Sequence, residues 1–353
     1  MRKTVAIVSL RFNPAFLQHL IAFAKAVREL GLEPQFLLDR EYERFSELTQ
    51  VAPMCHSYER SSATAWSHAI FLNASTGNPE LAMALHRDNV KIVYVYHEPW
   101  HMSGQYFWSE GIIGTAKAIA AHRLTVPVLK LSATVILESR FGMRMYEQAD
   151  ARYNSNYVYF PQIYDDDVQV ELSDLVHGKR YFSFLGTLCR SHGFDQYLGF
   201  MLGALERGAD LRFLIASRNA LPPSLEKDAR FQQSRDRIEI RCGRPLTNDE
   251  MNRCYAESFC VWNVYRRSTQ SGVLPKAMMF GTPVLASAAG SFPEYVRDGE
   301  NGRFVDAEQT DAILSALEDI QRNIPSYAAN CRKSFRDNFF YQSQVPELRL
   351  ILR

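Results

Sequence analysis

Residues 270–305 read QSGVLPKAMMFGTPVLASAAGSFPEYVRDGENGRFV. Ser271 and Gly272 stand where a loop turns into a helix, and free backbone amides at such a turn favour a phosphate group. Gly290 opens a second tight loop at the same edge, and Glu294 follows at the start of a short helix. The spacing alone leaves two interpretations open: a phosphate site, or three ordinary helix–strand connections.

Outward from this stretch, buried apolar runs alternate with amphipathic helical runs. In the first half, the apolar run 5–10 is followed by a helical pattern over 15–31 and an apolar run over 34–39. Such strand–helix–strand units build parallel sheets with helices on both faces. We therefore predict an α/β protein with two Rossmann-like domains. The periodicity lapses at about 161–178, so the predicted parts are residues 1–165, 175–325 and a helical tail, 326–353.

Composition excludes several classes of function. The 353 residues carry a formal net charge of +1, so no global field draws the chain to nucleic acid. The six cysteines form no C-x-x-C pair, which favours a reduced, cytoplasmic compartment. The N-terminus lacks a signal-peptide pattern, and no apolar run approaches the roughly 20 residues of a membrane span. Membrane contact, if any, is expected to be peripheral.

The stretch HEPWH, residues 97–101, fits the pattern of zinc peptidases. That pattern needs a helix, whereas Pro99 would break one and the preceding IVYVY is typical of a buried strand. Phe107 stands where a third ligand is expected, so we predict no metal here. HEPWH is then a loop at the carboxyl end of a strand, either a ligand-binding loop with a working His97 or a structural one. The run YDDD, Tyr164 to Asp167, is interpreted as solvated charge rather than a metal site.

Residues 270–305 resemble the donor-binding signature of GT-B glycosyltransferases, in particular the large retaining family that uses nucleoside diphosphate sugars. The matching residues are Ser271, Gly272, Val273, Ala277, Met278, Gly281, Pro283, Val284, Ala286, Ser287, Gly290, Pro293, Glu294, Asn301 and Gly302. The stretch FLGTLCRSHGFDQYL, residues 184–198, is similar to the loop that clamps the diphosphate in that family. Thr187 replaces the family's arginine there, and His192 replaces its lysine.

The resemblance implies a donor site in the second half of the chain. Its predicted residues are Gly186, Thr187, Arg190, His192, Gly243, Arg244, Pro245, Arg266, Gln270, Ser271, Gly272, Val273, Lys276 and Glu294. Lys276 and Ser268 stand where the family has a pair of glutamates. A lysine cannot accept hydrogen bonds from ribose hydroxyls, so Lys276 is interpreted either as a donor-facing cation or as a surface lysine.

The implied activity is transfer of a sugar from a UDP-, GDP- or ADP-type donor to a glycan or lipid-linked acceptor, in cell-surface polysaccharide or glycoconjugate synthesis. The resemblance implies a retaining reaction without metal or cofactor, in which the donor's phosphate oxygen takes the acceptor's proton. His97 is the predicted catalytic residue, with Glu98 as the alternative; an inverting reaction would need one of them as a base.

Fewer sequence features indicate where the acceptor binds. Asn13, Tyr106 and Trp108 are predicted acceptor residues, and the C-terminal helix is expected to cross back to the first domain. The stretch AHRLTVPVLKL, residues 121–131, mixes cations with apolar residues, which suits a membrane surface. Two alternatives remain at this point: a non-catalytic sugar-nucleotide-binding protein, and a sugar-nucleotide epimerase or hydrolase of the same fold.

Overall fold

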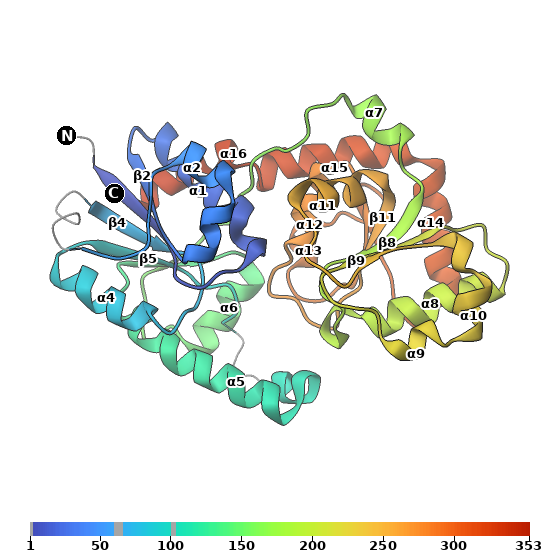
Figure 1. Ribbon diagram of the computed structural model, residues 1–353, viewed down its shortest axis with the longest axis horizontal. Coiled ribbons are helices and arrows are strands. Elements are labelled where there is room, and N and C mark those ends of the chain that lie inside the picture. Colours follow the sequence, from blue (N-terminus) through green and yellow to red (C-terminus); the bar gives the residue numbers. More distant parts are fainter. Residues whose placement is uncertain (1–2, 60–65, 100–103) are drawn as a thin grey trace. The chain divides into compact units, whose positions relative to one another are not determined.

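The computed structural model describes residues 3–59, 66–99 and 104–353, without the side chains of 104–110. The chain divides into two compact units, Met1–Asp165 with Asn338–Arg353, and Asp166–Asp337. Each unit is a parallel sheet with helices on both faces, as the sequence predicts (Figure 1). The division near 337 replaces the boundary expected at 325, which falls inside a continuous helix, α15 (Ile324–Asn338).

Unit 1 contains a seven-stranded sheet in the order β3-β2-β1-β4-β5-β6-β7. Its strands are β1 (Thr4–Ser9), β2 (Glu33–Leu38), β3 (Met54–Cys55), β4 (Trp66–Phe71), β5 (Lys91–Val95), β6 (Thr134–Leu137) and β7 (Tyr157–Tyr159). Its helices are α1 (Leu17–Glu29), α2 (Ser46–Val51), α4 (Asn78–Arg87), α5 (Gly104–Leu131), α6 (Arg140–Ala149) and α16 (Tyr341–Ile351), with 3-10 turns η1 (Pro14–Phe16) and η2 (Arg40–Arg44).

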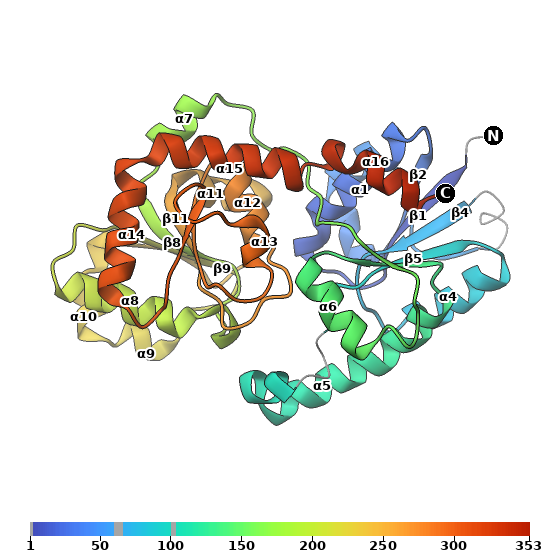
Figure 2. The same cartoon turned by 180° about the vertical axis from the view of Figure 1, so that it is seen from behind.

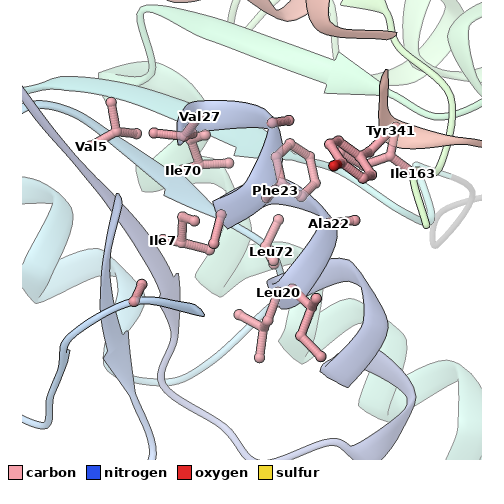
Figure 3. Packing of buried hydrophobic residues seen from close by; sticks show 14 of the residues in the cluster. Val5, Ile7, Leu20, Ala22, Phe23, Val27, Ile70, Leu72, Ile163 and Tyr341 are labelled. Atoms are coloured by element: carbon pink, nitrogen blue, oxygen red, sulfur yellow. The ribbon is translucent and has the colours of Figure 1, made fainter. Parts of the chain in front are cut away.

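Two buried clusters hold the helices of unit 1 on the sheet. Val5 and Ile7 of β1 face α1, α2 and α16, while Ala6 and Val8 face α4, α5 and α6. This alternation is what a strand buried on both faces requires. Figure 3 shows the first cluster, in which Tyr341 of α16 joins side chains of β1 and α1. The last helix therefore belongs to unit 1, as expected.

Unit 2 contains a six-stranded sheet in the order β10-β9-β8-β11-β12-β13. Its strands are β8 (Tyr181–Leu185), β9 (Phe213–Ser217), β10 (Ile238–Cys242), β11 (Ser258–Asn263), β12 (Val284–Ala286) and β13 (Gly302–Phe304). Its helices are α7 (Leu172–His177), α8 (Phe194–Glu206), α9 (Pro223–Glu226), α10 (Ala229–Gln233), α11 (Asn248–Glu257), α12 (Val273–Met279), α13 (Phe292–Tyr295), α14 (Thr310–Arg322) and α15, with 3-10 turns η3 (Arg190–His192) and η4 (Arg235–Arg237). Helices α8, α9, α10 and α14 share one core cluster with the sheet (Figure 2).

The order of strands reverses once in each sheet. In unit 1 the chain builds outward from β1 to β3 and then returns to place β4 on the other side of β1. In unit 2 the same reversal occurs between β8 and β11. Loops at the carboxyl ends of the two strands then diverge to opposite faces and leave a crevice, which is where open α/β sheets bind ligands.

Candidate functional site

The loops after β8 and β11 meet at the reversal point of unit 2. A Cβ built on Gly186, directly after β8, would lie 3.6 Å from Cγ2 of Val273 at the start of α12. The backbone N–H of Arg266, after β11, donates to the carbonyl oxygen of Ser191 at 2.9 Å. The structure therefore brings together two stretches that the sequence analysis assigned to the donor.

Two glycines allow three loops to pack backbone against backbone. Gly193 has φ 70°, and a Cβ there would lie 2.4 Å from the carbonyl oxygen of Val264. Gly290, in the loop after β12, has φ 66°, and a Cβ there would lie 1.9 Å from the carbonyl oxygen of Ser268. Neither distance can accommodate a carbon atom, so both positions require glycine. The loops after β8, β11 and β12 consequently pack closely against one another at one edge of the sheet.

Below this edge lies a buried asparagine with an unsatisfied oxygen. The side chain of Asn263, at the end of β11, is fully buried, and its Nδ2 donates to Ser271 Oγ at 3.5 Å. Its Oδ1 has no hydrogen-bond partner among the described residues, and the same holds for the indole nitrogen of Trp262. Leaving such an atom unpaired costs about 1–3 kcal/mol. Polar atoms kept at this cost are typical of a ligand site.

His192 is fixed by its neighbours rather than extended into solvent. Its ring stacks on Tyr265, with centroids 4.4 Å apart and planes 10° apart. Burial raises the pKa of the Cys189 thiol, but hydrogen bonding and charge from His192 outweigh burial and lower it. At the position where the resemblance would place a lysine, the His192 imidazole therefore stacks on the Tyr265 ring and lowers the pKa of the Cys189 thiol.

Two of the arginines predicted for the donor form ion pairs within the protein. Arg266 makes two hydrogen bonds to the Asp195 carboxylate, at 2.6 and 2.8 Å, and one to the carbonyl oxygen of Arg190 at 2.7 Å. Arg244 makes two to Glu250, at 2.9 and 2.5 Å. The side chain of Arg190 is exposed and forms no ion pair with the described residues.

The other predicted donor residues differ in position. Thr187 and Gly272 are exposed in the two central loops, and Gln270 and Glu294 are half-buried nearby in sequence. The loop containing Gly243 and Pro245 follows β10, which is separated from β8 by β9. Two strand spacings amount to roughly 10 Å, so this loop lies farther along the edge.

Lys276 is buried and ion-paired. Its side chain has 11% relative exposure, and Nζ lies 2.6 Å from Asp167 Oδ2 and 3.1 Å from Asn252 Oδ1. Asp167 also accepts hydrogen bonds from Asn248 and Asn252. Burial raises the pKa of Asp167, but Lys276 and the two amides lower it further than burial raises it. The alternative of a surface lysine is wrong, because Lys276 is committed to the acidic run.

The interpretation of the acidic run as solvated charge is also wrong. Asp165 pairs with Lys25 in unit 1, and Asp166 receives two hydrogen bonds from Arg332 in unit 2, at 2.9 and 2.7 Å. Asp167 pairs with Lys276, so each of the three consecutive carboxylates has its own cation. All three are half-buried. Such partners lie far away in sequence, so spacing along the chain gave no signal of them.

In unit 1, His97 follows β5 and uses both ring nitrogens. Nδ1 bonds the Glu138 carboxylate, and Nε2 bonds the carbonyl oxygen of Leu72. Because a carbonyl and a carboxylate both accept, each nitrogen carries a proton and the ring is an imidazolium. Burial lowers the pKa of His97, but the charge and hydrogen bond of Glu138 outweigh it and raise the pKa.

Glu138 is the residue that the sequence analysis missed. Its side chain is 4% exposed, and it accepts a hydrogen bond from Gln162 at 3.3 Å in addition to that from His97. Burial raises the pKa of its carboxyl, but His97 and a further positive contribution from His19 lower it. The available signal was its position, because Glu138 directly follows β6 at the same sheet edge as His97.

The remaining predicted residues of unit 1 have separate positions. Glu98 is exposed next to His97. Asn13 Oδ1 accepts from the N–H of Ala15 at 3.1 Å and so caps η1. The side chains of Tyr106 and Trp108, and all of His101, lie outside the described residues. Within the part of the chain that is described, no three His, Cys, Asp or Glu side chains are grouped to hold a metal ion.

Comparisons with known proteins fit this arrangement. Residues 179–323, which include the loops after β8, β11 and β12, match the family profile described as Glycosyl transferases group 1. The chain therefore has the fold of GT-B structures, and most of its second unit matches the group 1 glycosyltransferase profile.

The fold extends over the whole length of its solved neighbours. Anabaena HepE, in complex with UDP, has a TM-score of 0.72 and 16% identity, with 100% of this chain and 99% of that chain covered. Sucrose-phosphate synthase from Thermosynechococcus elongatus has a TM-score of 0.69 and 12% identity, with 99% and 98% covered. An MMP α-(1→4)-mannosyltransferase from Mycolicibacterium hassiacum is 36% identical over 92 residues, which span 25% of this chain and 22% of that protein.

The His97–Glu138 pair predicts a specific pH dependence of stability. The folded pKa of His97 lies above its ordinary 6.5 and that of Glu138 below its ordinary 4.5. The stabilisation is therefore fullest between those values, declines as pH rises through the folded pKa of His97, and declines as pH falls through that of Glu138. We expect Glu138→Gln to lower the free energy of unfolding by about 3 kcal/mol at pH 6 and by less at pH 9.

Urea denaturation at both pH values measures this difference. The exposed neighbour provides the control, because Glu98→Gln should change stability by less than about 0.5 kcal/mol. An equal loss at pH 6 and pH 9 in Glu138→Gln would contradict a charged pair.

The Lys276–Asp167 pair makes a second prediction. Lys276→Met should lower the free energy of unfolding by about 3 kcal/mol, because Asp167 is left half-buried without its cation. The double variant Lys276→Met/Asp167→Asn should recover most of that loss. Chemical denaturation of both variants is the measurement, and the exposed pair Lys333–Asp337 provides the control: Lys333→Met should cost less than about 0.5 kcal/mol. Equal losses in the single and double variants would show that the ion pair contributes nothing.

Proposed function

We propose that this chain transfers a sugar from a nucleoside diphosphate sugar to a hydroxyl group of an acceptor. The observation that carries the proposal is the edge of unit 2 where the loops after β8, β11 and β12 pack closely at Gly193 and Gly290, beside the reversal of strand order. The family profile covers those same loops. The unsatisfied Asn263 Oδ1 beneath them is an acceptor suited to a hydroxyl of the donor.

The donor is proposed to be of the UDP, GDP or ADP type. HepE of similar fold is described in complex with UDP and with UDP-glucose, and the partial relative is a mannosyltransferase. In this chain, Arg266 and Lys276 are engaged by Asp195 and Asp167, so the diphosphate is proposed to bind backbone amides, hydroxyl groups and Arg190. No metal ion or cofactor is assigned to the reaction.

A retaining reaction is proposed, in which the donor's own phosphate oxygen takes the proton of the acceptor hydroxyl. Its support in unit 1 is the state of His97, whose two ring nitrogens both donate to partners within the unit. An imidazolium held in this way is not a base. An inverting reaction would need a base, and the role would pass to the exposed Glu98.

A glycan or lipid-linked acceptor is proposed, in cell-surface polysaccharide or glycoconjugate synthesis, with the chain in the cytoplasm at the inner face of a membrane. The support is α5, which bends at Gly111, where φ is 70°. By length and composition alone, Gly111–Leu131 is long and apolar enough to cross a bilayer, so the prediction that no apolar run approaches this length is wrong; the sequence analysis singled out only 121–131 of this segment. Its inner face, including Val128 and Leu129, is buried in the core of unit 1, so we propose that the helix lies on a membrane surface.

The outward face of α5 combines apolar and cationic residues. Ile112 and Ile113 are 75% and 74% exposed, and Leu124 is 39% exposed. Exposed Lys117 and Arg123 lie on the same side by helical spacing, and residues 111–131 contain no acidic residue. We call these five residues the α5 stripe. Its charge is complementary to anionic lipid headgroups, and its isoleucines suit the interface.

Donor turnover tests the proposed activity. The full chain is incubated with a panel of UDP-, GDP- and ADP-sugars, and release of the nucleoside diphosphate and free sugar is measured. We expect slow hydrolysis of one donor class with retained anomeric configuration, because transferases leak to water when no acceptor is present. Binding of a nucleotide without any turnover would favour the non-catalytic alternative, and an altered sugar in the product would favour an epimerase. No binding and no turnover with any donor would end the proposal.

Vesicle co-sedimentation tests the α5 stripe. The chain should bind vesicles of phosphatidylglycerol and phosphatidylcholine, bind phosphatidylcholine alone weakly, and dissociate as salt rises. Lys117→Glu/Arg123→Glu should reduce binding at least about tenfold, since each cation near an anionic surface contributes about 1 kcal/mol. Ile112→Ser/Ile113→Ser should also reduce binding at least about tenfold, because the variant removes apolar side chains that would be buried at the interface. Arg218→Glu/Lys227→Glu, which changes two exposed cations elsewhere, should bind as the unmodified chain does. Equal binding by all three variants would remove the stripe from the membrane contact.

A further inference from the structure

Unit 1 has a cavity at the place where its own strand order reverses. The cavity has a volume of about 370 Å³ and is lined by residues that follow β1, β2 and β4, with α5 as one wall. The parallel strands β1 and β4 are neighbours at the point where the order of strands reverses, so this is the crevice that the topology of unit 1 creates. The sequence analysis assigned none of its lining residues to the acceptor, and it assigned only those of α5, within 121–131, to a membrane surface.

Two asparagines brace the walls of the cavity and retain unsatisfied oxygens. Asn78, which lines the cavity, donates through Nδ2 to the carbonyl oxygen of Asn73 at 2.7 Å. Asn73 donates in turn to the carbonyl oxygen of Arg11 at 2.7 Å. These bonds join the start of α4 to the loops after β4 and β1. They also fix both amide orientations, and among the described residues neither Oδ1 has a hydrogen-bond partner.

The burial of these oxygens makes the missing partner significant. Asn78 is 2% exposed and Asn73 is 6% exposed. An unpaired acceptor that is buried to this degree needs a donor group. A ligand that carries hydroxyl groups supplies such donors, whereas an anion would not.

The lining combines polar and apolar side chains. Arg11 offers hydrogen-bond donors, Asp39 and Asn78 offer acceptors, and Leu10, Leu124 and Val128 are apolar. A lone phosphate is disfavoured by the Asp39 carboxylate, and a lone cation by Arg11. A pyranose ring has both features that the cavity offers, because it carries hydroxyl groups at its rim and an apolar C–H face.

We infer that this cavity binds the pyranose ring of the acceptor, with Asn78 and Asp39 accepting hydrogen bonds from its hydroxyl groups. The inference rests on the proposed function, because only a transferase needs a second sugar site. It adds a location and residues for the acceptor that differ from Asn13, Tyr106 and Trp108. The α5 wall also joins the cavity to the α5 stripe, since Leu124 belongs to both.

Two variants block the cavity without removing the buried asparagines. Ala121→Phe places a ring on the α5 wall, and Thr76→Trp fills the cavity from an exposed position. Ala120→Phe is the matched control, because Ala120 is exposed on the same helix and does not line the cavity. Circular dichroism and thermal unfolding verify that each variant is folded, and Thr76→Trp serves if Ala121→Phe is not.

Binding is measured on the full chain without donor, by saturation-transfer NMR with methyl and octyl α-glucopyranosides and α-mannopyranosides. We expect at least one sugar to bind the unmodified chain and the Ala120→Phe control, and to bind at least tenfold more weakly to Ala121→Phe and Thr76→Trp. An equal loss for the methyl and octyl forms supports recognition of the ring. A loss confined to the octyl forms overturns it, because the cavity would then bind the alkyl chain.

Two further results would overturn the inference: no binding of any of the four glycosides by the unmodified chain, or unchanged binding in both blocking variants. The donor-turnover assay distinguishes failure of the inferred acceptor site from failure of the proposed function, because donor hydrolysis does not require an acceptor. Hydrolysis of the donor in the blocking variants at the rate of the unmodified chain, together with lost glycoside binding, supports an acceptor site separate from the donor loops.

Discussion

The reversal of strand order in each sheet is the constraint on which both candidate sites depend. Right-handed crossovers place successive helices on one face until the order reverses, after which they occupy the other face. The loops on either side of the reversal therefore separate, and the backbone at that point lies open. In this chain each reversal has a buried asparagine whose side-chain NH2 group donates a hydrogen bond to a neighbouring loop: Asn263 at the end of β11, and Asn78 after β4. Each retains an unpaired oxygen among the described residues.

The three carboxylates of the acidic run, Asp165 to Asp167, form ion pairs that hold the chain in place. Asp165 is anchored to Lys25 in unit 1, while Asp166 and Asp167 are anchored to Arg332 and Lys276 in unit 2. The chain is thus held by a half-buried ion pair on each side of the division. At position 276, where the resembling family has a glutamate, the lysine holds this segment, and Asp167 is the carboxylate that now lies beside it. Removing one member of such a pair costs more than the pair itself contributes, because the partner stays behind without compensation.

The sequence was sufficient for the fold because the fold is encoded locally. Strands such as β1 and β5 are continuous apolar runs, and the glycines at 193 and 290 mark turns whose geometry admits little else. The pairings within the sites were not accessible in the same way. His97 meets Glu138 across 41 residues, and Lys276 meets Asp167 across 109, and nothing in either local pattern selects the partner. Those contacts are set by which strands become neighbours, which single-sequence periodicity does not determine.

At the proposed donor site, several of the predicted cations are paired with carboxylates, and the exposed Arg190 forms no ion pair with the described residues. Arg266 and Arg244 are neutralised by Asp195 and Glu250, and Lys276 by Asp167. We therefore propose that backbone N–H groups of these loops, together with hydroxyl groups and Arg190, stabilise a diphosphate bound here. Fixed donors of this kind are effective because they need no reorganisation as charge develops on the leaving group. The positions of these N–H groups depend on the close approach of the loops at Gly193 and Gly290. A site that relies on backbone donors because its cations are paired therefore requires glycine at both positions.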